Sequence, residues 1–516
     1  MTIRRIRGVR TRRSVGDPLP QKRAGRLVMR FFSSCALFVA VLASLMAGGS
    51  LALSGAAPAS ASPAGITVNC PADNLADAIY SAPAGSTLLV SGTCTGNFYI
   101  DKSLTLSGPA TLDGGGVPTQ YGSTLNVAAG TVVLNSLVIQ DGVGINNIGG
   151  GVWNSGALTL NHSAVTHNTA GVASGVFNQG QLTLNSSTVS NNTSTSTYGS
   201  GGIFNCGGNA GFESFGLCTG STSLTLNNST VSNNVGGAAG DGGGIDNDLQ
   251  GTLKLNGSTV SGNATGGSGG GIQNNGTATL ISSKVSGNAA SDGNGGGIEN
   301  NGTATLISST VSGDTAGTFN NGGGIDNEGT ATLIASAVSG NTSGNTGGGI
   351  QNGGTATLNF STVSGNTGGS GGGIQNNGTA TLNVTLVANN SSTAGGQFFG
   401  NGGGVSSGPS NTDLTTLNYS IIRANSAVFV GGGIFAGGGP MKINHSVVTG
   451  NSAGTTAGGM LVWNGPTMVV NSAFSSNSDP GLLLPDTLPG VLVAPANYLG
   501  PGSNNPSFTT MHSTYS

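Results

Sequence analysis

Charge of either sign is scarce in this chain. Only 6% of the 516 residues are Asp, Glu, Lys or Arg, and ten of the 15 basic residues lie before residue 31. After residue 61 the chain keeps five basic and seventeen acidic residues, which is a net charge of −12. A surface of this sign repels phosphate backbones, so we expect no nucleic-acid partner.

Long apolar runs are absent apart from one. It spans residues 31–53, directly after the basic segment, and Ala59-Ser60-Ala61 follows as a small-x-small cleavage pattern. This order is typical of an export signal over residues 1–61, and an uncleaved membrane anchor is the alternative. The rest of the chain has no candidate membrane span. We therefore expect a secreted or cell-surface protein.

Cysteine is rare, with five residues, and Cys35 lies in the export segment. An exported chain with an even number of remaining cysteines is expected to form disulfides. Pairing of sequence neighbours predicts Cys70–Cys94 and Cys206–Cys218, which is one of three possible connectivities. Free thiols are the alternative.

Aromatic residues make up only 5% of the chain, and the two tryptophans, Trp153 and Trp463, lie far apart in the sequence. This spacing argues against a tryptophan platform for sugars. The four histidines show no metal-binding spacing, and the acidic residues lack the paired patterns of a glycosidase. We therefore predict no catalytic residue.

Glycine, in contrast, is abundant, with 96 residues but no Gly-X-Y period, which excludes collagen. Residues 241–381 repeat nearly the same segment six times. An Ile follows each glycine run, and successive copies are 27, 26, 27, 25 and 24 residues apart. The six residues are Ile245, Ile272, Ile298, Ile325, Ile350 and Ile374. A period in the twenties predicts one structural unit stacked on its copies.

Each copy alternates apolar and polar residues with a period of two. Ala278 and Leu280 are expected to point inward, as is Ile272, while Thr277 and Thr279 point outward. The pattern predicts an all-β fold, a single-stranded parallel β-helix or solenoid, and its hand is expected to be right by analogy with β-helices of this coil length. We expect three short strands per coil and about 12 to 15 coils.

The chain divides into four parts by composition. We predict an export signal over 1–61, an N-terminal cap with the first coils over 62–125, the repeat array over 126–480 and a Pro-rich C-terminal tail over 481–516. Within the cap, Asp73 or Asn74 is expected to begin a short helix that ends near Ser81 and covers the first sheet edge. The prolines of the tail are suited to the last edge because they cannot donate to a ladder.

Two columns of asparagine recur through the repeats. The first column, predicted to be a structural hydrogen-bonded ladder, contains Asn247, Asn274, Asn300, Asn327, Asn352 and Asn376. The second ends each Val-Ser-Gly-Asn segment and contains Asn263, Asn288, Asn341 and Asn366. Asp314 interrupts the second column, where it either bends the ladder or accepts a cation.

The position after each repeated Ile is polar and variable. It reads Asp246, Gln273, Glu299, Asp326, Gln351 and Gln375, and we expect these side chains to form one outward column. The candidate calcium ligands on this face are Asp246, Asp248, Glu299, Asp326 and Glu328. A paired-carboxylate glycosidase site and a plain solvated acidic face are the alternatives.

Threonines at Thr-x-Thr positions form a second outward array over five repeats, from Thr277 to Thr381. Threonine suits exposed strand positions, so ordinary β-propensity explains the array. Ice-binding solenoids carry similar grids, which makes ice binding a minor alternative function.

The repeats resemble right-handed parallel β-helix proteins of the pectate-lyase-like superfamily, most of all bacterial surface proteins related to the chlamydial polymorphic outer-membrane proteins. Their Gly-Gly-Ala-Ile and Phe-x-x-Asn motifs correspond here to Gly271-Ile272 within Gly-Gly-Gly-Ile and to Val285-x-x-Asn288. The resemblance covers roughly residues 66–480. It implies export and, in some members, adhesion.

We therefore predict a secreted or cell-surface repeat protein with a structural, adhesive or glycan-binding role and no catalysis. Its expected partner is an extracellular glycan or a surface protein, and we expect a monomer with no cofactor other than calcium. A polysaccharide lyase or glycoside hydrolase is the alternative function.

Overall fold

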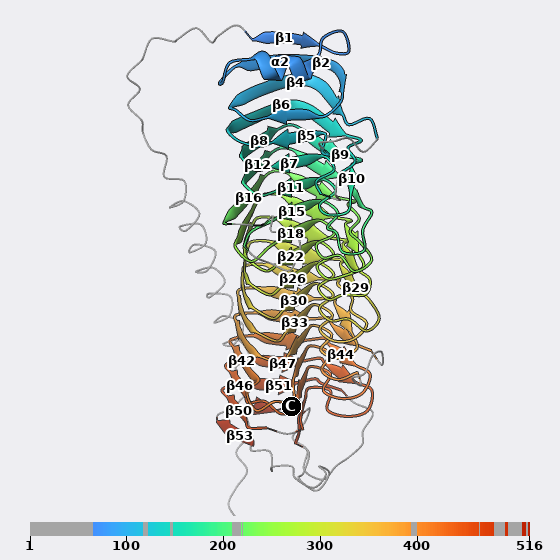
Figure 1. The fold of residues 1–516 in the computed structure, drawn as a ribbon. Coiled ribbons are helices and arrows are strands. Elements are labelled where there is room, and N and C mark those ends of the chain that lie inside the picture. The colour runs from blue at the N-terminus through green and yellow to red at the C-terminus, as the bar shows by residue number, and fades with distance from the viewer. Residues whose placement is uncertain are drawn as a thin grey trace, which may run out of the picture. The chain divides into compact units, whose positions relative to one another are not determined.

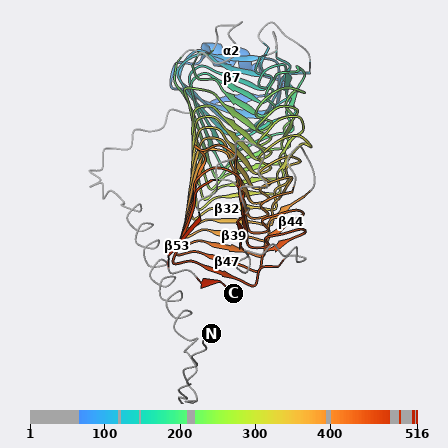
Figure 2. The same cartoon turned by 90° about the horizontal axis from the view of Figure 1, so that it is seen from below.

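Over the residues that it describes, the computed structural model of this protein is a parallel β-solenoid of about 15 turns with one short helix (Figure 1). It describes residues 65–116, 122–144, 148–208, 218, 220–393, 400–463, 465–478, 491–493, 508–511 and 514–515. The predicted export signal over 1–61 lies outside the described residues. Figure 2 shows the coils lying over one another along the stack.

One coil illustrates the plan of all the others. Strands β22 (Ile272–Asn274), β23 (Thr277–Ile281) and β24 (Lys284–Ser286) are the three main strands, and β25 (Ala289–Ala290) is a fourth, two-residue strand present in several coils. Each strand pairs in parallel and in register with its counterpart in the next coil, as Ile272 does with Ile298. The predicted parallel β-helix with three short strands per coil is confirmed.

Strands of the β22 type form a fifteen-stranded sheet, here called the Ile-x-Asn sheet. Its members are β3 (Phe98–Ile100), β5 (Leu125–Val127), β7 (Val152–Asn154), β11 (Val176–Asn178), β15 (Ile203–Asn205), β18 (Ile245–Asn247), β22, β26 (Ile298–Asn300), β30 (Ile325–Asn327), β33 (Ile350–Asn352), β37 (Ile374–Asn376), β41 (Val405–Ser407), β45 (Ile434–Ala436), β49 (Met460–Val462) and β52 (Val491–Val493).

Strands of the β23 and β24 types together form a thirty-stranded sheet. The long strands are β1 (Ile66–Asn69), β2 (Thr87–Thr95), β4 (Leu104–Asp113), β6 (Thr131–Gln140), β8 (Ala157–Asn161), β12 (Gln181–Asn185), β16 (Thr222–Asn227), β19 (Gly251–Asn256), β23, β27 (Thr303–Ile307), β31 (Thr330–Ile334), β34 (Thr355–Asn359), β38 (Thr379–Asn383), β42 (Leu414–Asn418), β46 (Met441–Asn444), β50 (Thr467–Val470) and β53 (Phe508–Met511). The short strands are β9 (Ala164–Thr166), β13 (Thr188–Ser190), β17 (Thr230–Ser232), β20 (Thr259–Ser261), β24, β28 (Thr310–Ser312), β32 (Ala337–Ser339), β35 (Thr362–Ser364), β39 (Leu386–Ala388), β43 (Ile421–Arg423), β47 (Val447–Thr449), β51 (Ala473–Ser475) and β54 (Thr514–Tyr515). The two-residue strands are β10 (Thr169–Ala170), β14 (Thr193–Ser194), β21 (Ala264–Thr265), β25, β29 (Thr315–Ala316), β36 (Thr367–Gly368), β40 (Ser391–Ser392), β44 (Ser426–Ala427) and β48 (Ser452–Ala453).

The hydrophobic core is a continuous column inside the coils. Ile272, Leu280 and Val285 are each at most 1% exposed, and their counterparts in the other coils join the same cluster. The alternation predicted from the repeat places these residues inside, because successive side chains of a strand point to opposite faces. The core therefore runs the length of the stack.

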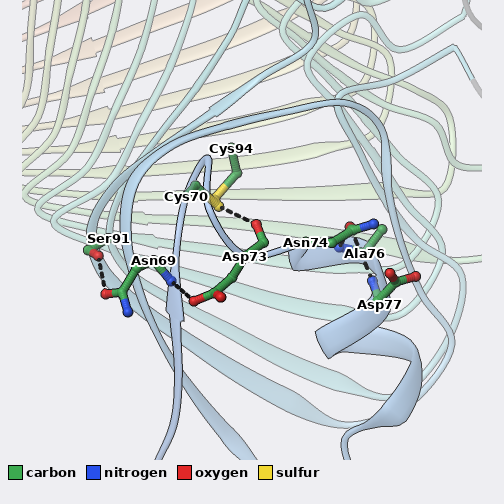
Figure 3. Close-up of a disulfide and its surroundings, with 8 residues drawn as sticks. All are labelled: Asn69, Cys70, Asp73, Asn74, Ala76, Asp77, Ser91 and Cys94. Carbon is green, nitrogen blue, oxygen red and sulfur yellow. Dashed lines mark hydrogen bonds between the residues drawn. A yellow bond between two sulfur atoms is a disulfide. The ribbon is translucent and has the colours of Figure 1, made fainter.

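The N-terminal edge is covered as predicted. Helix α2 (Leu75–Ser81) buries Leu75 and Ile79, and the side chain of Asn74 caps it by accepting a hydrogen bond from the Ala76 backbone at 3.0 Å. The Cys70–Cys94 disulfide ties the loop before this helix to β2 (Figure 3). Both predicted disulfides, this one and Cys206–Cys218, are present in the structure.

The C-terminal part also belongs to the solenoid. Strands β52, β53 and β54 pair in parallel with β49, β50 and β51, so residues of the Pro-rich tail add to the last coil. Among the described residues, no helix is both long enough and apolar enough to cross a bilayer.

Candidate functional site

The first asparagine column forms a buried ladder along the last residues of successive strands in the Ile-x-Asn sheet. Asn274, Asn300 and Asn327 are 0% exposed. The Nδ2 of Asn274 donates to Asn300 Oδ1 at 2.7 Å, and that of Asn300 donates to Asn327 Oδ1 at 2.6 Å. The same amides donate to backbone carbonyls, such as that of Gly302. These side chains satisfy one another and the backbone, which assigns them to stacking.

The second column is also a ladder, and Asp314 keeps its place in it. Both the backbone N and the Nδ2 of Asn288 donate to Asp314 Oδ1, at 2.8 and 2.9 Å, and the Asp314 backbone donates to Asn341 Oδ1 at 2.9 Å. The other carboxylate oxygen, Oδ2, has no hydrogen-bond partner. Burial raises the pKa of Asp314 to about 7.

The column of variable polar residues is buried, so the expectation that it is a solvated outward face is wrong. Asp246 is 8% exposed, Glu299 6% and Asp326 1%. The reason is the path of the glycine run before each strand, which covers the strand's outer side. A Cβ on Gly295 would lie 2.6 Å from the backbone N of Glu299, so only glycine permits this approach.

The structure divides the five calcium candidates into two groups. The strand register places Glu299 beside Asp326 on adjacent coils, and Glu328 lies two residues beyond Asp326. Asp246 and Asp248 belong to a coil separated from Glu299 by that of Gln273. Among the described residues, no three His, Cys, Asp or Glu side chains gather closely enough to hold a metal ion. Calcium binding stays a prediction.

Several oxygens of the buried acids lack hydrogen-bond partners. Both carboxylate oxygens of Asp326, Glu299 Oε2 and Asp248 Oδ2 accept no hydrogen bond. Burial, reinforced by the negative charges of Asp326 and Glu328, raises the pKa of Glu299 to about 9. Burial and the charge of Glu328 raise the pKa of Asp326 to about 8. Burial, followed by Asp241 and Asp248, raises the pKa of Asp246 well above its usual value.

The same position of the sheet carries aromatic residues in earlier coils, which the sequence reasoning missed. Trp153, Phe177 and Phe204 lie on consecutive coils, with ring centroids 5.4 and 5.7 Å apart. Phe177 and Phe204 pack against Cys206 and Cys218 in a cluster outside the main core. The Cys206–Cys218 disulfide therefore lies against this aromatic row. Each of the three aromatic residues directly follows an apolar strand residue, Val152, Val176 or Ile203, and this shared position could have revealed the row from the sequence.

A second feature missed from the sequence lies at the corner between each long strand and the short strand that follows. The corner residue adopts a left-handed backbone, and in four successive coils that begin with residue 360 it is large. Phe360, Val384, Tyr419 and His445 have φ values of 53°, 52°, 51° and 48°. We call these four residues the corner strip. The corresponding residues of other coils are His162, Ser186, Asn228, Gly257, Ser282, Ser308, Ala335 and Asn471.

The corner strip is exposed and partly stacked. Phe360 is 52% exposed, Val384 39% and Tyr419 61%. The rings of Tyr419 and His445 stack with centroids 4.8 Å apart and an interplanar angle of 16°. His445 Nε2 lies 3.1 Å from Asn471 Nδ2 on the next coil.

Polar groups flank the corner strip. The last residues of the long strands form an amide ladder, in which Asn418 donates to Asn383 and Asn444 donates to Asn418, both at 2.9 Å. The exposed Arg423 ends β43 in the coil of Tyr419. An exposed apolar stripe beside ordered amides and a guanidinium is suited to binding a ligand with both apolar and hydroxyl faces.

The threonine grid is also in register. Thr277 pairs with Thr303 and Thr279 with Thr305, and the pairing continues to Thr379 and Thr381. The grid faces outward, as expected. Ice binding at this face stays a prediction that a thermal-hysteresis assay would test.

Comparison of the chain with protein-family models, with curated proteins and with solved structures gives no match.

Proposed function

We propose that this protein is a secreted or cell-surface solenoid rod that binds an extracellular glycan along the corner strip and catalyses no reaction on it. The observation that carries the proposal is the exposed row of Phe360, Val384, Tyr419 and His445 on successive coils. The coil spacing of about 4.8 Å presents these side chains as a linear series, which suits a linear polymer.

The residues of the corner strip adopt a backbone conformation that large side chains disfavour. Left-handed conformations are unfavourable for bulky and β-branched residues and cost about 1–3 kcal/mol each. Serine, alanine or glycine fills the same corner at Ser282, Ala335 and Gly257, so the fold itself does not require a large side chain. Large apolar groups held there and exposed to solvent contribute little to the core. Their presence at these exposed corners supports a role in binding.

The chemistry around the strip favours a sugar over a purely apolar partner. Aromatic faces pack against the C–H faces of a pyranose, while amides and a guanidinium hydrogen-bond its hydroxyl or carboxylate groups. The Asn418 and Asn444 amides supply such groups beside Tyr419, and Arg423 supplies a guanidinium four residues further along the same coil. A glycan that carries carboxylates would use Arg423 as its cationic contact.

Export is part of the same proposal. Residues 1–61 have the order of a signal sequence, and the disulfides Cys70–Cys94 and Cys206–Cys218 suit an oxidising compartment. The alternative, a hydrolase with paired carboxylates, gains little support from Glu299 and Asp326. These groups are 6% and 1% exposed, and a sugar ring does not reach carboxylates covered in this way.

A glycan array with the purified protein tests the proposal, with the variants Phe360→Ser and Tyr419→Ser. Serine occupies this corner elsewhere, so both variants should fold. We expect binding of one glycan class and at least a tenfold loss of affinity in each variant. Tyr198→Ser is the matched control, because Tyr198 is 65% exposed but lies outside the strip. Absence of any glycan ligand, or unchanged affinity in Tyr419→Ser, would contradict the proposal.

A further inference from the structure

We propose that a divalent cation of the Ca²⁺ type binds between two adjacent coils of the Ile-x-Asn sheet, held by Glu299 and Asp326 with Glu328 at the rim. This site lies apart from the corner strip and does not depend on glycan binding.

The first argument is the position of the two carboxylates. Glu299 on β26 and Asp326 on β30 are register partners, so their backbones lie one strand spacing apart, about 4.8 Å. Both side chains are more than nine-tenths buried. Three of their four carboxylate oxygens, Glu299 Oε2 and both of Asp326, have no hydrogen-bond partner. Two acids on adjacent coils are therefore buried with three of their four oxygens unused.

The second argument comes from the neighbouring coils, where an uncharged residue fills the same position. Gln273 donates through Nε2 to Asn275 Oδ1 at 3.2 Å, and Gln351 Oε1 accepts from Thr346 Oγ1 at 2.8 Å. An amide thus suits this position with partners available. A buried ionised carboxylate without a partner costs several kcal/mol, so the acids at these two coils need either a bound cation or a proton to neutralise them.

The surroundings supply no such charge. In the described part of the chain, no lysine or arginine forms an ion pair with Glu299, Asp326 or Glu328. Other acids add to the negative potential, since Asp241 also acts on Glu299. No neighbouring side chain neutralises the pair, so the cation or the proton that does so comes from solution.

Glu328 forms the exposed rim of the proposed site, and the arrangement of the acids favours one kind of ion. Glu328 is exposed, and its carboxylate lies over Gly353, where a side chain would overlap it. The Glu328 charge acts on both Glu299 and Asp326. Because the three carboxylates do not surround one point, water must complete the shell. Ca²⁺ accepts irregular sets of six to eight oxygens, whereas Mg²⁺ demands a near-ideal octahedron.

Isothermal titration of the metal-free protein with CaCl₂ at pH 7.5, paired with thermal unfolding, tests the site. We expect saturable binding and a higher Tm in calcium, and at least a tenfold loss of affinity in Glu299→Gln and in Asp326→Asn. The neighbouring glutamines indicate that these amide variants fold. Asp292→Asn removes an exposed acid from the same segment and should bind calcium normally.

Three results would overturn the site. One is the absence of both heat and a Tm shift at millimolar calcium in the unmodified protein. A second is undiminished calcium affinity in the Glu299→Gln, Asp326→Asn double variant. The third is a double variant that is more stable than the metal-free protein while calcium leaves the unmodified protein unchanged, since a shared proton would then neutralise the pair.

Discussion

Replacing Asp314 by asparagine should stabilise the solenoid, and the gain should grow with pH. In the ladder around it, each asparagine donates through Nδ2 to a valine carbonyl of the preceding coil, as Asn341 does to Val311 at 3.1 Å. The equivalent acceptor for Asp314 is the carbonyl of Val285. An ionised Asp314 has no proton to donate there, and its Oδ2 is left without a partner. A protonated Asp314, or an asparagine, restores the donor.

The pKa of Asp314 sets the size of the effect. Burial raises this pKa from 3.8 to about 7, so the folded state prefers the protonated acid. The stability contributed by the protonated form is therefore fully present below pH 3.8 and is lost as the pH rises through about 7. At about 1.4 kcal/mol per pKa unit, the loss approaches roughly 4 kcal/mol by pH 8. Asparagine avoids this loss because it does not titrate.

Urea denaturation of the unmodified protein and Asp314→Asn, followed by circular dichroism at pH 4 and pH 8 with a chelator present, measures the difference. We expect nearly equal midpoints at pH 4 and a clearly higher midpoint for the variant at pH 8. Asp292→Asn controls for the change in net charge, because Asp292 is exposed. The reasoning is refuted if Asp314→Asn is no more stable at pH 8, or if its gain is the same at both pH values.

Three further perturbations probe the stack. Asn300→Ala removes one rung of the buried ladder and should lower the free energy of unfolding by about 1–3 kcal/mol, measured by urea titration against the exposed-site variant Asn301→Ala. Gly323→Ala would drive a methyl group against the Thr342 backbone and should cost about 1–3 kcal/mol in the same assay, and an unchanged midpoint would contradict the close packing of the glycine run. Removal of the Cys70–Cys94 disulfide, which closes a separation of 24 residues, should cost about 3 kcal/mol and expose the N-terminal cap to limited proteolysis, and equal protease resistance would contradict this.

Most of the fold could be predicted from the repeat because each coil's neighbour carries nearly the same residues. The period of two within Thr277–Ile281 orients Ala278 and Leu280, and repetition then places each side chain beside its own copy. The register followed directly from aligned copies, and so did the inward position of Ile272. Nearest-neighbour pairing of the cysteines agreed with the structure because both pairs lie close in the sequence.

The candidate sites were less predictable because they depend on how one segment covers another. Glu299 alternates outward from its strand, so its sequence position indicated exposure, yet the glycine run beginning at Gly295 lies against the strand and buries it. The corner strip was missed because left-handed turns favour small residues, so Phe360 and Val384 gave no sign in the sequence that they occupy such turns.

The sequence by itself determined the local and repeating features: short strands, an inward apolar column, a capped first edge and the stacking asparagines. These follow from periodicity and from residue preferences within a single coil. Only the tertiary structure decided which outward residues meet solvent, because exposure depends on the path of the glycine runs and on the left-handed corners. That decision separates the buried pair Glu299 and Asp326 from the exposed corner strip at Phe360–His445.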